Sequence, residues 1–140
     1  MRPFNGIQVG DALGPVEHVF TTEAVRAFCR VWGQEGEVNR FTSPEAAQRE
    51  GLPGPIVPGI MTAAVLARFL TEWADGGGLR LLDLIFRQPI PHHLPVRLVG
   101  TVTDTREEGG QGLVEVDVFI QGPEGERMVT GRAILALPGA

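Results

Sequence analysis

Length, composition and charge indicate one globular domain and exclude several classes of partner. The chain has 140 residues, of which 43% are apolar and 21% charged, as is usual for a folded domain with its own core. The formal net charge of −5 argues against nucleic acid or an anionic membrane surface as a standing partner. All 12 basic residues are arginine, so lysine chemistry such as a Schiff base is excluded.

We expect a cytoplasmic protein that crosses no membrane. Residues 1–6 lack the apolar stretch of a signal peptide. The longest apolar run, residues 60–70, is interrupted by Arg68 and is too short to span a bilayer. The one cysteine, Cys29, has no partner for an internal disulfide, which favours a reducing compartment.

The first half of the chain predicts one strand and two short helices. Residues 15–21 suit a strand, and Thr22 is placed to cap the helix that follows. Apolar residues then recur at helical spacing and predict one buried helix face: Val25, Phe28, Cys29 and Trp32. A second, short helix opens with Ser43 as its cap and Pro44 in its first turn, and Gly51 closes it.

A long helix is predicted from Pro58 or Gly59 to about Ala74. Its apolar side chains cover nearly the whole circumference, which is typical of a helix inside a core. At a rise of 1.5 Å per residue such a helix is about 24 Å long, which matches the width of a sheet that wraps it.

The second half of the chain predicts strands. The expected strands are residues 79–88, 95–106, 113–121 and 126–137. In the third of them apolar side chains alternate with acidic ones, which indicates one buried face. Consecutive strands joined by short turns predict an antiparallel meander. With one buried helix this gives an α+β fold that spans residues 1–140 as a single domain.

Several common site types are not supported by the residues present. Ser43 is the only serine and is better placed to cap a helix than to attack a carbonyl. Cys29 lies on the predicted buried helix face and is expected to be a core residue. The neighbours His92 and His93 would point to opposite faces of an extended chain, and no spacing resembles a zinc site. We therefore expect no metal and no cofactor.

Three segments resemble the MaoC-like dehydratases, a family that includes (R)-specific enoyl-CoA hydratases. Residues 43–62, SPEAAQREGLPGPIVPGIMT, resemble the family's short helix followed by the Gly- and Pro-rich entry into its central helix. Residues 20–28 resemble the lead-in to that region, and FRQPI at 86–90 resembles the strand before the meander. The resemblance covers nearly the whole chain and implies a hot-dog fold, a long central helix wrapped by an antiparallel sheet.

The family resemblance also implies a reaction, a site and an assembly. Family members form dimers with an acyl-thioester tunnel at the interface, and they add water reversibly to a trans-2-enoyl thioester. A backbone N–H at the start of the central helix binds the thioester oxygen, and Gly59 stands at that position here. The other expected substrate-binding residues are Pro58, Ile60, Met61 and Phe41.

The family's catalytic Asp and His are not intact in this chain. If Asn39 is aligned with the Asn of the family motif, Glu37 replaces the Asp, and the His position falls at Phe41 or in a one-residue gap. If Gly33 is the anchor instead, Gln34 stands at the Asp and Asn39 at the His. The candidate catalytic residues are therefore Glu37, as a carboxylate base whose environment raises its pKa, and Asn39. No feature of the sequence places His92 or His93 in the tunnel.

Two functions stay open, and a third ranks last. The first is a hydro-lyase acting on acyl-CoA or acyl-carrier-protein thioesters, with a water site rewired around Glu37 and Asn39. The second is a non-catalytic acyl-thioester-binding subunit of a hot-dog heterodimer. A homodimer, a higher oligomer and a heterodimer with a related chain are all compatible with the resemblance. A thioesterase would need a carboxylate on the central helix, where Glu72 and Asp75 lie at the end away from Gly59.

Overall fold

The computed structural model describes residues 2–33 and 38–139. In chain order these form a short 3₁₀ helix η1 (Phe4–Gly6), strand β1 (Ala12–Val19), helices α1 (Thr22–Val31), α2 (Pro44–Arg49) and α3 (Gly59–Ala74), and strands β2 (Gly78–Phe86), β3 (Pro95–Glu108), β4 (Gln111–Gln121) and β5 (Arg127–Pro138). The predicted elements are all present, with ends that differ by a few residues.

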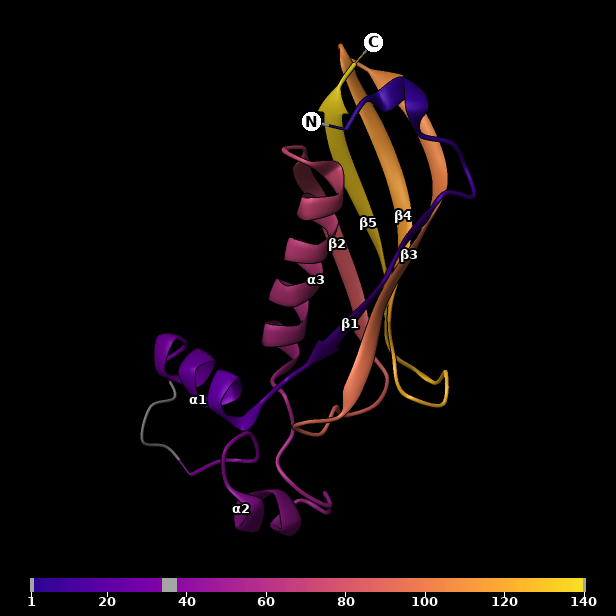
Figure 1. The fold of residues 1–140 in the computed structure, drawn as a ribbon. Helices are drawn as coiled ribbons and strands as arrows, with labels where there is room; N and C mark the ends of the chain where they lie inside the picture. The colour runs from indigo at the N-terminus through magenta and orange to yellow at the C-terminus, as the bar shows by residue number, and fades with distance from the viewer. Residues whose placement is uncertain (1, 34–37, 140) are drawn as a thin grey trace.

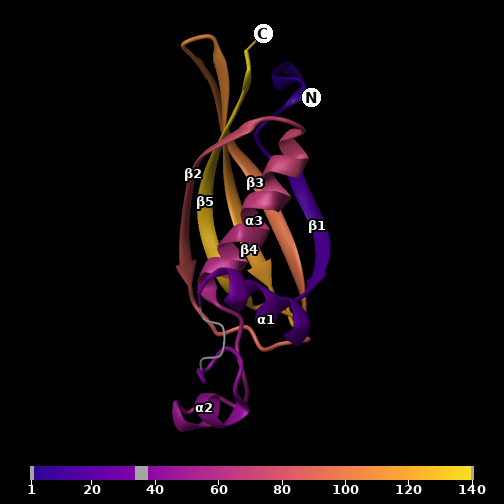
Figure 2. The same cartoon turned by 90° about the vertical axis from the view of Figure 1, so that its left-hand side faces the viewer.

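One antiparallel sheet carries the long helix. Its strand order is β1-β3-β4-β5-β2, and α3 lies along one face of it (Figures 1 and 2). Helices α1 and α2 gather at the end of the sheet where α3 begins, and both chain termini lie at the opposite end (Figure 1). The expected α+β class, with a long helix against an antiparallel sheet, is confirmed.

The predicted meander is right for three strands and wrong for the fourth. Strands β3, β4 and β5 pair in sequence, but β2 pairs with β5 at the far edge and not with β3. The physical reason is the connection of residues 87–94, which is too long for a hairpin. It crosses the end of the sheet beneath the start of α3 (Figure 2).

The core lies between the sheet and α3. The predicted buried face of β4 is confirmed, because Val114, Val116, Val118 and Ile120 are all completely buried. They belong to one hydrophobic cluster with Leu66 and Leu70 of α3. Full burial of one such side chain stabilises the fold by about 1.5–3 kcal/mol.

Helix α3 is covered on one side only. The expectation that it is buried all round is wrong for the single chain, because the one sheet covers a single face of the helix. Met61, Leu66 and Leu70 face inward, whereas Ile60 is 52% exposed and Arg68 is also exposed. Among the described residues no helix combines the length and the apolar content that crossing a bilayer requires.

Helix caps agree with the sequence for α2 and differ by one residue for α1. Ser43 Oγ accepts the Ala46 N–H at 3.1 Å, as predicted for α2. The cap of α1 is Thr21, whose hydroxyl accepts the Ala24 N–H at 3.1 Å, and not Thr22. Thr22 is the first helical residue, and its hydroxyl is engaged by two histidines instead.

Candidate functional site

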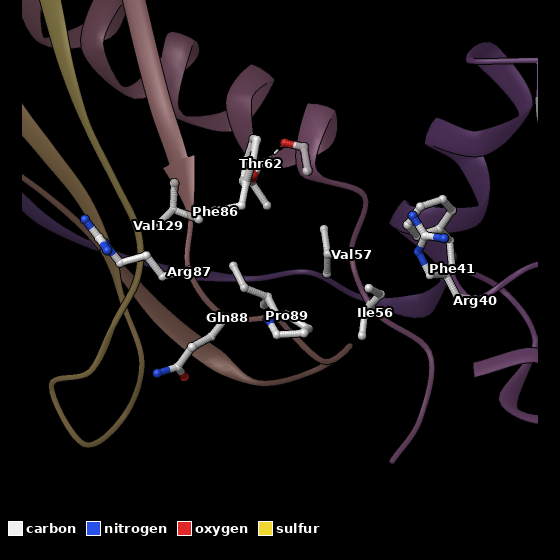
Figure 3. Close-up of a pocket in the computed structure, with 12 residues that line it drawn as sticks. Arg40, Phe41, Ile56, Val57, Thr62, Phe86, Arg87, Gln88, Pro89 and Val129 are labelled. Atoms are coloured by element: carbon white, nitrogen blue, oxygen red, sulfur yellow. Dashed lines mark hydrogen bonds between the residues drawn. The ribbon is translucent and has the colours of Figure 1, made fainter. Parts of the chain in front are cut away.

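A pocket of about 310 Å³ opens where α3 begins. One wall comes from the end of β2 and the chain after it, and the other from the segment before α3 (Figure 3). The lining residues are Arg40, Phe41, Ile56, Val57, Gly59, Thr62, Phe86, Arg87, Gln88, Pro89, Ile90 and Val129. Most of these side chains are apolar, so the interior suits a hydrocarbon chain, with a few polar groups at the edges.

The start of α3 borders this pocket through Gly59 and Thr62. The N–H of Gly59 is in the first helical turn, so it has no acceptor inside the helix, and the helix dipole favours negative charge at this end. Thr62 Oγ1 donates to the Gly59 carbonyl oxygen at 2.6 Å and fixes the first turn. A Cβ on Gly59 would lie 3.2 Å from the Phe86 ring, so glycine allows the ring to pack against the backbone.

A turn at residues 39–43 presents Phe41 to the pocket. Asn39 Oδ1 accepts the Phe41 N–H at 2.9 Å and the Thr42 hydroxyl at 3.3 Å, an arrangement by which Asn side chains shape turns. The Phe41 ring lies 5.9 Å from the Trp32 ring, measured between centroids, and 4.8 Å below the Arg40 guanidinium. Asn39 thus builds the wall and is not itself a lining residue.

The described lining of the pocket contains two arginines, Arg40 and Arg87, and no carboxylate. Arg40 pairs with Glu50 outside the lining at 3.3 Å, and Arg87 Nε donates to Thr130 Oγ1 at 3.0 Å. Arg40 thus has a carboxylate partner, whereas the printed partner of Arg87 is a neutral hydroxyl, so Arg87 is the better suited of the two to meet an anionic ligand.

The two neighbouring histidines lie together, contrary to the expectation that they point apart. His93 has a φ of 65°, so the dipeptide is a turn and not an extended segment. His92 Nδ1 and His93 Nε2 lie 2.9 Å and 3.0 Å from the Thr22 hydroxyl oxygen. The other ring nitrogen of His92 lies 3.3 Å from the Ile56 carbonyl oxygen. Both nitrogens of His92 are thus engaged behind the pocket wall.

The expected site residues are only partly brought together. Gly59 and Phe41 line the pocket, Pro58 and Met61 are buried, and Ile60 is exposed on the open side of α3. Glu37 lies outside the described residues. Among the residues that are described, no three His, Cys, Asp or Glu side chains gather as a metal ion would require.

Half of the lining residues that the sequence analysis missed come from one segment, residues 86–90; the others are Arg40, Ile56, Val57, Thr62 and Val129. The likeness of residues 86–90 to the family's FRQPI-like strand was a signal that this segment belongs to the same site. The backbone places it there, because the Val57 N–H donates to the Ile90 carbonyl oxygen at 2.8 Å and Ile56 forms an isolated bridge with Pro91. The sequence gave no reason to place His92 or His93 in the site, and neither lines this pocket, whereas Pro89 and Ile90 just before them do.

Comparison with known proteins defines the fold. No protein-family model and no curated protein matches the chain. Among solved structures it resembles a monoamine oxidase regulatory protein from Archaeoglobus fulgius (TM-score 0.85, 14% identity, 99% of this chain and 95% of that one). It also resembles an (R)-hydratase from A. caviae involved in PHA biosynthesis (TM-score 0.82, 23% identity, 94% of this chain and 98% of that one). A third match is a chain of the ChsH1–ChsH2 complex from Mycobacterium tuberculosis (TM-score 0.81, 18% identity, 93% of this chain and 98% of that one).

Further matches are MaoC-like dehydratases and another (R)-hydratase. The chain therefore has the hot-dog fold of MaoC-like dehydratases and (R)-hydratases, as the sequence resemblance predicted. A likeness at these identities establishes the fold and leaves the activity to be argued from the site.

Proposed function

We propose that the chain binds an acyl thioester in this pocket and catalyses reversible addition of water to a trans-2-enoyl thioester. The observation that carries the proposal is the meeting of three features in one pocket. These are the first-turn N–H of Gly59, a largely apolar interior, and two arginines in the lining. A thioester oxygen that gains negative charge during hydration would be stabilised by that N–H. The phosphates of CoA or of a carrier-protein arm would suit Arg40 and Arg87.

The proposed water site uses Glu37 and Asn39. Glu37 would take a proton from water as a general base. Asn39, whose side-chain oxygen shapes the turn that carries Phe41, would hold the segment beside the ligand.

A non-catalytic acyl-thioester-binding subunit is the second candidate function, and one observation favours it. Within the described lining of the pocket no carboxylate or imidazole is present, and both His92 nitrogens have partners elsewhere. The two candidates share the ligand and differ in turnover. A chain of this fold in the ChsH1–ChsH2 complex shows that hot-dog chains occur in assemblies of two different chains.

The deciding experiment uses the purified chain alone. Crotonyl-CoA and longer trans-2-enoyl-CoAs are added, loss of the enoyl absorbance is followed, and butyryl-CoA affinity is measured by calorimetry. Hydration above background supports the hydro-lyase. Binding without hydration supports the subunit. If the chain shows neither binding nor hydration, both candidate functions are contradicted.

Gly59→Ala is expected to weaken butyryl-CoA binding about tenfold, which corresponds to about 1.4 kcal/mol. The added Cβ meets the Phe86 ring at 3.2 Å, so either the ring or the first turn of α3 must shift at the point where the thioester oxygen would bind. Calorimetry measures the affinity, and circular dichroism checks that the fold is retained. Gly54→Ala is the matched control, because its Cβ would have no atom within 4 Å. Unchanged affinity in Gly59→Ala would remove Gly59 from the site.

We also propose that the chain forms a homodimer through the edge of β2. This strand is largely apolar, pairs with β5 alone among the described strands, and leaves Ile85 55% and Phe86 54% exposed. An exposed apolar edge strand invites pairing with a second chain. The opposite edge, β1, is less suited because a bulge at Gly14 and Pro15 interrupts its register. Pairing of two β2 strands about a two-fold axis would also bring the open sides of α3 together.

Ile85→Lys is expected to reduce the assembly to single chains, since it places a charge in the proposed apolar interface. Light scattering coupled to size exclusion measures the mass. Val31→Lys is the control, because Val31 is 89% exposed at the end of α1, away from β2. A dimer that survives Ile85→Lys would contradict the proposed edge.

A further inference from the structure

His92 connects three segments that are far apart in the sequence. Its Nε2 lies 3.3 Å from the Ile56 carbonyl oxygen, and the Phe41 backbone is near enough to act on the pKa of the ring. Its Nδ1 lies 2.9 Å from the hydroxyl oxygen of Thr22, the first residue of α1. Ile56 and Phe41 both line the candidate site, so the ring ties two pieces of its wall to α1 from behind.

The partners determine where the protons lie. A carbonyl oxygen only accepts, so His92 Nε2 must carry the hydrogen that it donates to Ile56. A neutral ring then leaves Nδ1 as an acceptor for the Thr22 hydroxyl. Because that hydroxyl has a single hydrogen, its oxygen is then free to accept from His93 Nε2–H, 3.0 Å away, in the tautomer that carries the hydrogen there. In the other tautomer His93 Nε2 accepts the Thr22 N–H at 3.5 Å.

The environment of His92 favours this neutral state. Burial lowers the pKa of His92, and the positive charges of His93 and Arg26 lower it further. The backbone groups of Ile56 and Phe41 act in the opposite sense. With a lowered pKa in the folded protein, the stabilisation from neutral His92 is full above the ordinary value of 6.5 and is lost as the pH falls below it.

This arrangement requires a turn with an uncommon backbone conformation. His93 adopts a left-handed φ of 65°, which is uncommon for a residue other than glycine. Its N–H donates to the Phe20 carbonyl oxygen at 2.9 Å, which fixes the turn next to the start of α1. Strain of this kind persists where the surrounding contacts determine the conformation, and here they aim two rings at one hydroxyl.

We propose that His92 is the positioning residue of the candidate site: its Nε2–H, oriented through Thr22 and His93, holds Ile56 and Phe41 in the geometry that binds the acyl thioester. The ligand part of this inference rests on the proposed function. The role is one of positioning, because His92 does not line the pocket and both its nitrogens have protein partners.

Three substitutions of His92 distinguish the effect of its Nε2–H donor from the effect of the volume that its ring fills. His92→Gln places an amide N–H where Nε2 stands and can still reach Ile56. His92→Asn reaches Thr22 but is too short for Ile56, and His92→Leu fills the space with no hydrogen bond. We expect His92→Asn and His92→Leu to weaken butyryl-CoA binding about five- to tenfold, and His92→Gln to stay within about threefold of the wild type.

A readout without ligand keeps this test separate from the proposed function. The Ile56 N–H donates to the Arg40 carbonyl oxygen at 3.0 Å, and the Val57 N–H to that of Ile90 at 2.8 Å. Hydrogen exchange at these two amides is expected to accelerate about five- to tenfold in His92→Asn and His92→Leu, but not in His92→Gln. If the wild type fails to bind butyryl-CoA, the proposed function fails, and the exchange rates still decide the positioning role.

Other outcomes would overturn the inference. Unchanged exchange in all three variants would show that His92 does not hold the wall. Weaker binding with unchanged exchange would mean that the ring meets the ligand itself. Should the Asn and Leu variants not fold, imidazole ¹⁵N shifts of the wild type at pH 7.5 give the answer. The Nε2–H form of His92 is expected, and the Nδ1–H form would exclude the bond to Ile56.

Discussion

Glu37→Gln is expected to hydrate crotonyl-CoA about 10²–10⁴-fold more slowly than the wild type, the usual effect of losing a general base. Glutamine has nearly the shape of glutamate but cannot accept the proton that water must lose. The affinity for butyryl-CoA should stay within about threefold, because the thioester is bound by other groups. Initial rates from enoyl absorbance and calorimetric affinities measure the two effects separately.

Glu35→Gln is the matched control, since it removes an acid of the same type two positions earlier in the same segment. We expect it to retain the rate of the wild type. Equal losses in both variants would indicate a general effect of charge, and no loss in Glu37→Gln would leave the hydratase without its proposed base. The alternative alignment, which puts Gln34 at the Asp position, would then be the one to test.

The order of elements could be predicted because local signals for it were strong. Ser43 followed by Pro44 marks the start of α2. The strict alternation in β4 marks one buried face, and that face is completely buried. The order of strands in the sheet could not be predicted in the same way. Placing β2 beside β5 depends on long-range pairing. No residue near the connection of residues 87–94 indicates that pairing.

The site was less predictable because turns and tertiary contacts build it. The cap of α1 was assigned to the wrong member of the pair Thr21 and Thr22, since either hydroxyl suits a cap and only the fold brings the histidines to Thr22. His92 and His93 were expected to point apart, because period-two alternation holds for strands and fails in a turn with a positive φ. Gly59 was named from the family resemblance, and it does lie at the start of α3 and in the lining of the pocket, while its role stays a prediction.

Gly131→Ala is expected to lower the free energy of unfolding by about 1–3 kcal/mol, or more, as overpacking does. Gly131 of β5 pairs with Leu84 of β2. An added Cβ would overlap the Leu84 side chain and lie 2.5 Å from the Asp83 carbonyl oxygen. Because one of these neighbours is backbone, a rotamer change cannot relieve the overlap and the strands must separate locally. Thermal unfolding should show a decrease of roughly 4–12 °C in Tm.

Gly78→Ala is the control in the same pair of strands, because its Cβ would have no atom within 4 Å. It should change the stability by about 0.5 kcal/mol at most. The comparison also bears on the site, since β2 ends at Phe86 and the Phe86 ring packs against Gly59. Displacing β2 should therefore weaken butyryl-CoA binding even at temperatures where Gly131→Ala is folded. If Gly131→Ala left the free energy of unfolding unchanged, β2 would not pair with β5 in this register. Phe86 could then not be placed over the start of α3.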